Sequence, residues 1–259
     1  MILAIDMGNS NIVVGGLDDN KTYFEERITT DDRKTSLEYA ILLKNILEIH
    51  KVKKNDIEGS LRASVVPPLN APISSAVKKI TGKKPLLVGS GMKTGLNIKM
   101  DNPKTVGGDR IVAAVAANAK YEGPIIIADM GTATTLDVVD HDGNYIGGVI
   151  LPGVKVALNS LVSNTAQLPR ISFDVPKRAI GKNTIECMRN GIMLGNAAML
   201  DGLIDRMTAE LGEPATLIAT GGMARFITPL CTHKITYDPD LLLRGLMILY
   251  RQNTETKDA

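Results

Sequence analysis

Hydrophobic and polar positions follow a distinctive order in the middle of the chain. Residues 125–128 form an apolar run that is typical of a buried strand, and the run ends at Asp129-Met130-Gly131. A second apolar run covers residues 136–139 and leads to Asp142-Gly143, a dipeptide that favours a hairpin turn. The pattern predicts a strand, a tight acidic turn, a strand, a second turn and a third strand.

The same order opens the chain. Residues 2–5 are apolar, Asp6-Met7-Gly8 begins a polar turn, and another apolar run follows. Asp6 and Asp129 are 123 residues apart, and the next acidic turns, at Asp19 and Asp142, keep that spacing. A repeat of whole structural units indicates a duplicated architecture. We expect two similar domains that face each other across a cleft, each contributing one acidic turn.

The rest of the chain alternates between strand-like and helix-like patterns, which predicts a mostly parallel α/β sheet with an antiparallel hairpin at one edge. In the helix expected over residues 36–50, Leu37, Ile41, Ile46 and Leu47 should face the core. Glu122-Gly123 separates the halves, so the predicted domains are residues 1–121 and 122–259. Further helices are expected over residues 72–80, 111–121, 154–162, 185–211 and 240–250, and further strands over 57–66, 85–88, 215–220 and 235–237.

Composition narrows the possible functions. The 259 residues are 44% hydrophobic and 22% charged, which is ordinary for a folded globular chain. The formal net charge of +2 gives no reason to expect nucleic acid or an anionic membrane as a partner. Two cysteines, no secretory segment and no membrane-spanning apolar stretch predict a cytoplasmic protein.

The sharpest catalytic motifs are missing. The sequence has no G-x-x-x-x-G-K-[S/T] loop, no G-x-G-x-x-G after a strand, and no G-x-S-x-G nucleophile. Its three histidines and two cysteines do not occur at the spacings of a zinc site.

Three acids beside glycine-containing turns remain as candidate chemistry. A phosphoryl-transfer site needs a phosphate-binding turn, a divalent ion and a group that accepts the proton of the nucleophile. The turn after Asp6 can supply the first two, and Thr132 with the Asp129 turn can hold the other side of a nucleotide. Asp109 is the candidate general base toward a hydroxyl group.

Two of these features have simpler interpretations. Gly107-Gly108-Asp109-Arg110 could be no more than a well-capped helix start, because an acid is favourable there. Arg110 argues against that interpretation, since an arginine at a helix N-terminus is unfavourable unless it holds an anion. Gly221-Gly222 follows a predicted strand, at a position where nucleotides often bind, but a glycine pair alone is a weak signal.

Together these motifs resemble a known family. The paired turns are similar to those of the acetate and sugar kinase, heat-shock-70 and actin superfamily, which folds as two ribonuclease-H-like lobes around a central nucleotide cleft. Within it, four segments in order resemble type III pantothenate kinases and span almost the full chain: residues 6–11, 107–110, 129–134 and 181–184. The combination is specific, although no single segment is.

The resemblance implies ATP-dependent phosphorylation of the pantothenate hydroxyl, the first step toward coenzyme A, in a homodimer. It implies that Asp109 is the base, that Asp6 lies near Mg²⁺ and that Asp129 binds K⁺ or NH₄⁺. The ATP-binding residues would be Asp6, Met7, Gly8, Asn9, Ser10, Asn11, Ile12, Val13, Thr132, Gly221 and Gly222. The pantothenate pocket would be lined by Met100, Gly107, Gly108, Asp109, Arg110 and Thr184.

Two positions depart from the family pattern. Family members usually carry a tyrosine where Met100 stands, so a phenol contact to the substrate is missing or rebuilt. Ser10 stands where threonine is common, and this change keeps the hydroxyl group. Two alternatives therefore stay open: another small-molecule kinase of the superfamily, which Met100 makes more plausible, or a non-catalytic regulatory relative that kept the fold.

Overall fold

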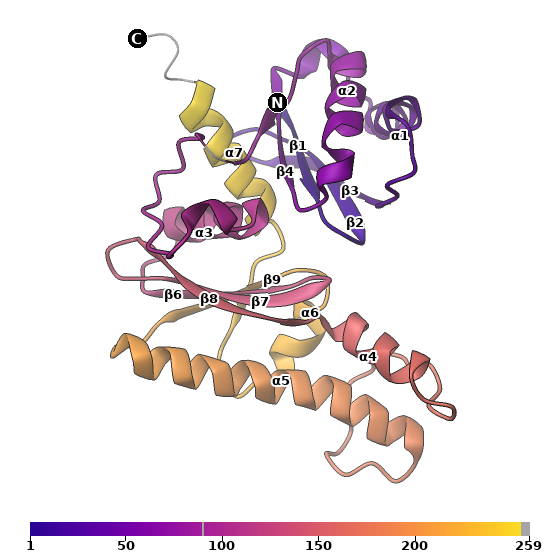
Figure 1. Ribbon diagram of the computed structural model, residues 1–259, viewed down its shortest axis with the longest axis vertical. Helices are drawn as coiled ribbons and strands as arrows, with labels where there is room; N and C mark the ends of the chain where they lie inside the picture. The colour runs from indigo at the N-terminus through magenta and orange to yellow at the C-terminus, as the bar shows by residue number, and fades with distance from the viewer. Residues whose placement is uncertain (90, 255–259) are drawn as a thin grey trace. The chain divides into compact units, whose positions relative to one another are not determined.

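The computed structural model describes residues 1–89 and 91–254, and this part of the chain forms two compact units (Figure 1). The first unit contains Met1–Gly95, Asp101–Ala116 and residues 241–254, and the second contains Leu96–Met100 and Ala117–Asp240. The sequence analysis assigned residues 122–259, including the last helix, to the second domain. The structure instead returns the last helix to the first unit.

Each unit is built on a five-stranded sheet with the same strand order. The first sheet runs β3-β2-β1-β4-β5 and the second runs β8-β7-β6-β9-β10. The strands of the first are β1 (Ile2–Met7), β2 (Asn11–Leu17), β3 (Thr22–Thr29), β4 (Gly59–Ser64) and β5 (Leu86–Leu87). Those of the second are β6 (Ile125–Met130), β7 (Ala133–Val139), β8 (Tyr145–Pro152), β9 (Thr216–Thr220) and β10 (Thr236–Tyr237).

The three strands predicted around each acidic turn are confirmed, but the expectation of mostly parallel sheets is wrong. In the first sheet, β1 pairs antiparallel with β2 and parallel with β4. The outer strands continue this pattern, because β3 is antiparallel to β2 and β5 is parallel to β4. The second sheet is divided in the same way. Each hairpin continues into a third antiparallel strand, so half of the pairings are antiparallel.

The repeat extends to the burial of single residues. β1 and β6 share one pattern of buried and half-buried positions, and β2 and β7 share another. A register shift interrupts the ladder between Gly16 and Leu17 in β2, and an equivalent shift lies between Val138 and Val139 in β7. Residues 8–10 join β1 to β2, whereas only residues 131–132 join β6 to β7. We call these connections the first turn and the second turn.

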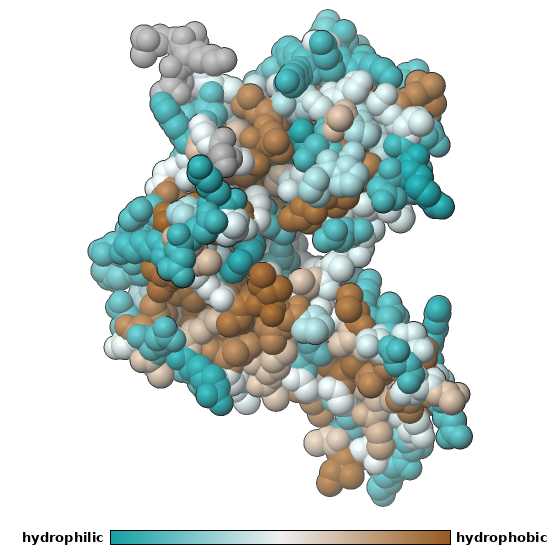
Figure 2. All heavy atoms as spheres, in the orientation of Figure 1, coloured by the Kyte–Doolittle hydropathy of each residue, from teal (hydrophilic) through white to brown (hydrophobic). Residues whose placement is uncertain are grey.

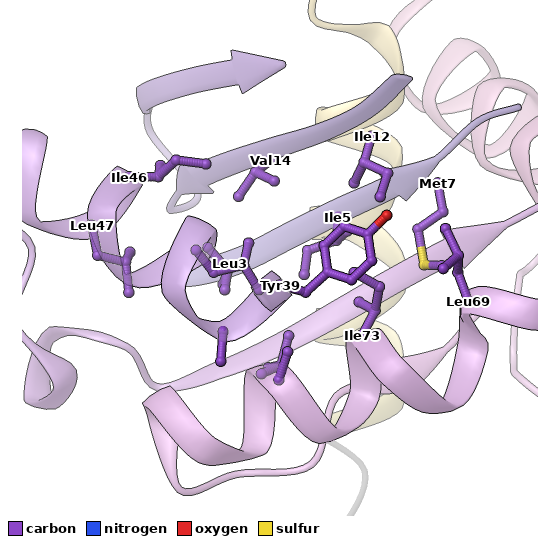
Figure 3. Close-up of a cluster of buried hydrophobic side chains, with 14 of the residues drawn as sticks. Leu3, Ile5, Met7, Ile12, Val14, Tyr39, Ile46, Leu47, Leu69 and Ile73 are labelled. Carbon is purple, nitrogen blue, oxygen red and sulfur yellow. The ribbon is translucent and has the colours of Figure 1, made fainter. Parts of the chain in front are cut away.

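Helices α1 (Ser36–Ile49) and α2 (Asn70–Thr81) cover one face of the first sheet. Figure 3 shows side chains of β1 and β2 pointing into this layer, with the fully buried Tyr39 of α1 among them. The first unit also contains most of α3 (Gly108–Lys120) and all of α7 (Leu241–Thr254), and α7 packs on β1 and β4.

In the second unit, α4 (Val154–Ser163), α5 (Thr184–Leu211) and α6 (Ala224–Ile227) contribute to a separate hydrophobic core. Met188 and Met193 of α5 are buried in it. In the part of the chain that the structure describes, no helix has the length and apolar character needed to cross a membrane.

The expected core face of α1 is partly wrong. Leu37 and Ile41 are 59% and 51% exposed, whereas Ile46 and Leu47 are buried as predicted. Leu37 and Ile46 are nine residues apart, which is two and a half helical turns, so they must lie on opposite sides of the helix. Tyr39 and Leu43 occupy the buried face instead.

The close packing of α7 on α3 gives a test of the first unit. A Cβ atom at Gly245 would lie 2.2 Å from the carbonyl oxygen of Val112, a backbone atom that cannot easily move. Gly245→Ala should therefore lower the free energy of unfolding by about 1–3 kcal/mol through overpacking. Chemical denaturation of the purified variant measures this change.

Gly191 in α5 provides the matched control. Nothing lies within 4 Å of a Cβ atom at this position, so Gly191→Ala should raise the free energy of unfolding by about 0.5–1 kcal/mol. Equal effects of the two substitutions would contradict the tight contact between α7 and α3.

Candidate functional site

The first turn is fixed by hydrogen bonds from a single threonine. The hydroxyl group of Thr30 donates to the carbonyl oxygen of Gly8 at 2.6 Å, and its backbone N–H donates to that of Ser10 at 3.1 Å. The turn is closed by the N–H of Gly8, which donates to the carbonyl oxygen of Asn11 at 3.0 Å. Two carbonyl groups of the turn are therefore directed toward Thr30.

Peptide planarity makes this arrangement suited to an anion. In a trans peptide the N–H and the C=O point in opposite directions. The N–H groups of Asn9 and Asn11, which follow the two bound carbonyl groups, therefore point away from Thr30. Asn9, Ser10 and Asn11 are exposed, so a phosphate could reach this turn from solvent.

Four further residues predicted to bind ATP, Asp6, Met7, Ile12 and Val13, flank the first turn in β1 and β2. Asp6 and Val13 are paired in register and half-buried, and Gly8 is also half-buried. Met7 and Ile12 are completely buried in the core of the first unit. Their side chains hold the hairpin in place, and only their backbones could face a nucleotide.

Thr30 was missed by the sequence analysis, and the core explains why it is well placed. The hydroxyl group of the buried Tyr39 donates to the carbonyl oxygen of Asp31 at 2.8 Å and accepts from its N–H at 3.1 Å. Arg33 binds the carboxylate of Asp31 and lowers the pKa of that group to about 2. The chain around Thr30 is thus attached to the hydrophobic core. No local sequence motif predicts this attachment.

The second turn has an equivalent backbone hydrogen bond. The N–H of Gly153 donates to the carbonyl oxygen of the exposed Thr132 at 3.1 Å, and Gly131 closes the turn through Ala133 at 3.0 Å. A Cβ atom at Gly153 would lie 2.2 Å from the carbonyl oxygen of Thr132. Only glycine therefore permits this contact at the start of α4.

Asp129 and Gly221 lie together in the second unit. Gly221 follows β9 with a φ of +89°, and a Cβ atom there would be 2.6 Å from Oδ1 of Asp129. The N–H of Met223 donates to the carbonyl oxygen of Met130 at 3.2 Å and holds this backbone against β6. Asp129 and Gly221 are half-buried, and Gly222 is exposed.

Asp109 lies in the first turn of α3, as the sequence predicted. One of its carboxylate oxygens accepts the N–H of Arg110 at 2.8 Å, and a Cβ atom at Gly107 would lie 2.5 Å from that same oxygen. Gly107 is therefore needed for the carboxylate to fold back on the backbone. Gly108 makes only ordinary contacts with Val88.

The other two residues predicted to contact substrate lie in the second unit. Thr184 is the exposed first residue of α5, and Asn183 caps this helix by accepting the N–H of Glu186 at 2.9 Å. Met100 lies beside Gly147 of β8. A Cβ atom at Gly147 would be 3.4 Å from the sulfur of Met100.

The predicted residues thus form two groups, one in each unit. The first unit holds Asp6 with the first turn, and also Gly107, Gly108, Asp109 and Arg110. The second holds Met100, Asp129, Thr132, Thr184, Gly221 and Gly222.

The residues predicted to bind metal ions, Asp6 and Asp129, fit ions that are bound mainly by other ligands. Within residues 1–89 and 91–254, no group of three or more His, Cys, Asp or Glu side chains could hold a metal ion. Mg²⁺ in kinases usually takes one or two carboxylates and completes its shell with phosphate oxygens and water. The half-buried carboxylate of Asp6 meets this requirement.

A separate hollow lies in the second unit at the C-terminal end of α5. It is an open depression of about 460 Å³, lined by Asp205, Thr208, Ala209, Gly212, Glu213, Pro214 and His233. None of these residues was predicted to bind ATP, metal or substrate.

Comparisons with known proteins agree with the fold and the motifs. A family model described as type III pantothenate kinase matches residues 2–206. A type III pantothenate kinase of Exiguobacterium sibiricum is 46% identical over 253 residues, which cover 98% of this chain and all of the relative. The Moorella thermoacetica protein of the same name is 42% identical, with the same coverage of both chains.

Solved structures share the fold at low sequence identity. A Campylobacter jejuni protein described as a Baf family transcriptional activator is 19% identical with a TM-score of 0.61, covering 98% of this chain and all of that one. Component A of the Acidaminococcus fermentans (R)-2-hydroxyglutaryl-CoA dehydratase is 16% identical with a TM-score of 0.58, covering 99% of each chain.

Two matching α/β units, each with an acidic turn after its first strand, define a protein with the actin-like fold. The relatives narrow this class further. The chain belongs to the type III pantothenate kinase family. Membership of a kinase family implies the use of ATP together with a divalent metal ion.

Thr30 gives a test of the first turn. Thr30→Val keeps the shape of the side chain but removes the hydrogen bond to Gly8, which is worth about 0.5–1.5 kcal/mol. Because the turn would lose its preferred orientation, the KM for ATP should rise by roughly two- to tenfold. Steady-state kinetics with varied ATP measures this change.

Two further variants control the experiment. Thr30→Ser keeps the hydroxyl group and should restore the KM for ATP. Thr29→Val changes the exposed neighbouring residue at the end of β3 and should have no effect. An unchanged KM in Thr30→Val would show that this hydroxyl does not orient the turn.

Proposed function

We propose that this chain transfers the γ-phosphoryl group of ATP to the hydroxyl group of pantothenate. The observation that carries the proposal is the similarity to type III pantothenate kinases, which extends over 98% of the chain at 42–46% identity. The geometry of the two turns and of Asp109 is compatible with that reaction.

The proposed roles follow from the contacts of each residue. The first turn binds phosphate through backbone N–H groups, while Asp6 supplies a carboxylate oxygen for Mg²⁺. Asp109 accepts the proton as the pantothenate oxygen bonds to the γ-phosphorus and the bond to the ADP oxygen breaks. Gly107 permits the folded-back position of Asp109, and Arg110 offers a positive charge to the substrate carboxylate.

The second unit supplies the remaining proposed roles. Thr132 contacts ATP from the second turn, and the backbone at Gly221 and Gly222 lies against adenosine, where side chains would block it. Asp129 binds K⁺ or NH₄⁺. Its carboxylate lies against the Gly221 backbone, and oxygen ligands of this kind suit such cations.

We also propose that the protein acts as a homodimer, with Thr184 near the subunit contact. Exposed apolar side chains gather around the start of α5, and Figure 2 shows brown surface over α4 in the same unit. The exposed residues are Val156, Leu161, Val175, Ile180 and Ile185, of which Ile180 is 82% exposed. Exposed apolar side chains that gather in one region often mark a protein contact.

The cytoplasm is the proposed compartment, supported by two free cysteines.

A substrate panel tests the function. Purified protein with ATP and Mg²⁺ should release ADP only when pantothenate and K⁺ or NH₄⁺ are both present. Asp129→Ala should lose activity together with the response to K⁺. Faster turnover of another hydroxyl compound would favour a different small-molecule kinase, and no turnover of any acceptor would favour a non-catalytic relative.

Asp109→Asn tests the proposed base. An amide cannot accept the proton, so kcat should fall by about 10²- to 10⁴-fold while the Kd for ATP stays unchanged. Rapid-quench kinetics and calorimetric titration with ATP separate the two quantities. Normal turnover in this variant would rule out the assignment of Asp109.

A further inference from the structure

The segment Leu96–Met100 is attached to the edge of β8. Its side chains alternate, with Leu96, Ile98 and Met100 half-buried and the two residues between them exposed. Ile98 forms a parallel bridge with Tyr145. The backbone N–H of Tyr145 donates to the carbonyl oxygen of Asn97 at 2.9 Å. The carbonyl oxygen of Tyr145 accepts the backbone N–H of Lys99 at 2.8 Å.

Two side-chain contacts reinforce this attachment from the turn between β7 and β8. The side-chain amide of Asn97 donates to Oδ1 of Asn144 at 2.8 Å, and Nζ of Lys99 lies 3.2 Å from a carboxylate oxygen of Asp140. Burial acts to raise the pKa of Asp140, but hydrogen bonds from Asn144 and Lys99 outweigh it and lower that pKa. Asp140 is therefore an ionised partner for Lys99 at neutral pH.

Tyr145 is itself held rigidly. Its side chain is fully buried, and its hydroxyl group donates to Oδ1 of the buried Asp137 at 2.6 Å. The other oxygen of Asp137 accepts the hydroxyl of Thr135 at 3.0 Å, and Thr135 is the register partner of Asp129. The anchor of the segment thus belongs to the same sheet as the proposed cation site.

The end of the segment carries Met100. Gly147 has a φ of +133°, a conformation that side chains rarely allow, and its open face lies next to the sulfur of Met100. A methionine has three rotatable bonds and adapts to many shapes. Because the side chain of Met100 is flexible, its position depends on where the backbone of the segment is held.

We propose that Asn97 and Lys99 are positioning residues that hold Met100 on β8 and thereby set the affinity for the acceptor substrate. The inference rests on the proposed function, because it takes Met100 as part of the pantothenate pocket. The two residues act through the backbone of the segment and do not touch the reacting atoms. Losing them should weaken substrate binding and leave phosphoryl transfer unchanged.

Kinetics of Asn97→Ala, Lys99→Met and the double variant test the inference. The ion pair is partly exposed and its energy is screened, so each single variant should raise the KM for pantothenate by about two- to threefold. The double variant should raise it by about fivefold to tenfold, while kcat and the KM for ATP stay within about twofold.

Matched controls separate positioning from general damage. Lys99→Arg keeps the charge and should restore the KM for pantothenate. Asp142→Asn alters an exposed carboxylate in the same turn and should leave every constant unchanged. Hydrogen exchange of the backbone amide of residue 99 should become faster in the double variant, which reports the detached segment independently of catalysis.

Two outcomes would overturn the inference. In one, the backbone amide of residue 99 exchanges faster while the KM for pantothenate stays constant, so the segment does not set affinity. In the other, kcat and both KM values change together, which indicates a structural defect. If the wild-type protein prefers another acceptor, the proposed function fails, and the same variants are then assayed with that acceptor.

Discussion

The planarity of two peptide groups is the constraint on which the proposed active site depends. In each unit, a residue beyond the third strand donates its N–H to a carbonyl group of the turn between the first two strands. Thr30 does so for Ser10, and Gly153 does so for Thr132. Each bound carbonyl group points toward its N–H donor. The N–H group of the same peptide, which belongs to the next residue, therefore points away from that donor. In the proposed site, these backbone N–H groups bind the phosphates of ATP, and the proposed role of the nearby acids is to supply charge and metal ligands.

The two units reach this geometry with different residues. Thr30 adds a side-chain hydrogen bond to Gly8, and its neighbour Asp31 is held by a tyrosine in the core. Gly153 makes no side-chain hydrogen bond. A Cβ atom at that position would clash with the carbonyl oxygen of Thr132, so the contact requires glycine. One turn is thus stabilised by an added hydroxyl group and the other by the absence of a side chain. The two units therefore share the backbone contact but not the residue type.

Several elements could be predicted because their signals are local. Asp6 and Asp129 each follow a short apolar run and precede a glycine, and the strands formed as expected. Asp109 was placed correctly in the first turn of α3 because a glycine pair precedes an alanine-rich helix. Leu37 was misplaced, since an apolar residue near a helix start does not reveal which face is buried. Thr30 was missed because nothing near it in sequence indicates that it bonds to Gly8, 22 residues away.

By itself, the sequence determined the duplicated strand and turn pattern, the acids beside it and the resemblance to one kinase family, because these depend on residues that are neighbours along the chain. Only the tertiary structure decided that α7 returns to the first unit, that Gly221 lies against Asp129, and that Leu96–Met100 joins the edge of β8. Each of these contacts joins segments far apart in sequence. Side-chain volume and backbone hydrogen bonding select such contacts, and their partners can be identified only after the chain has folded.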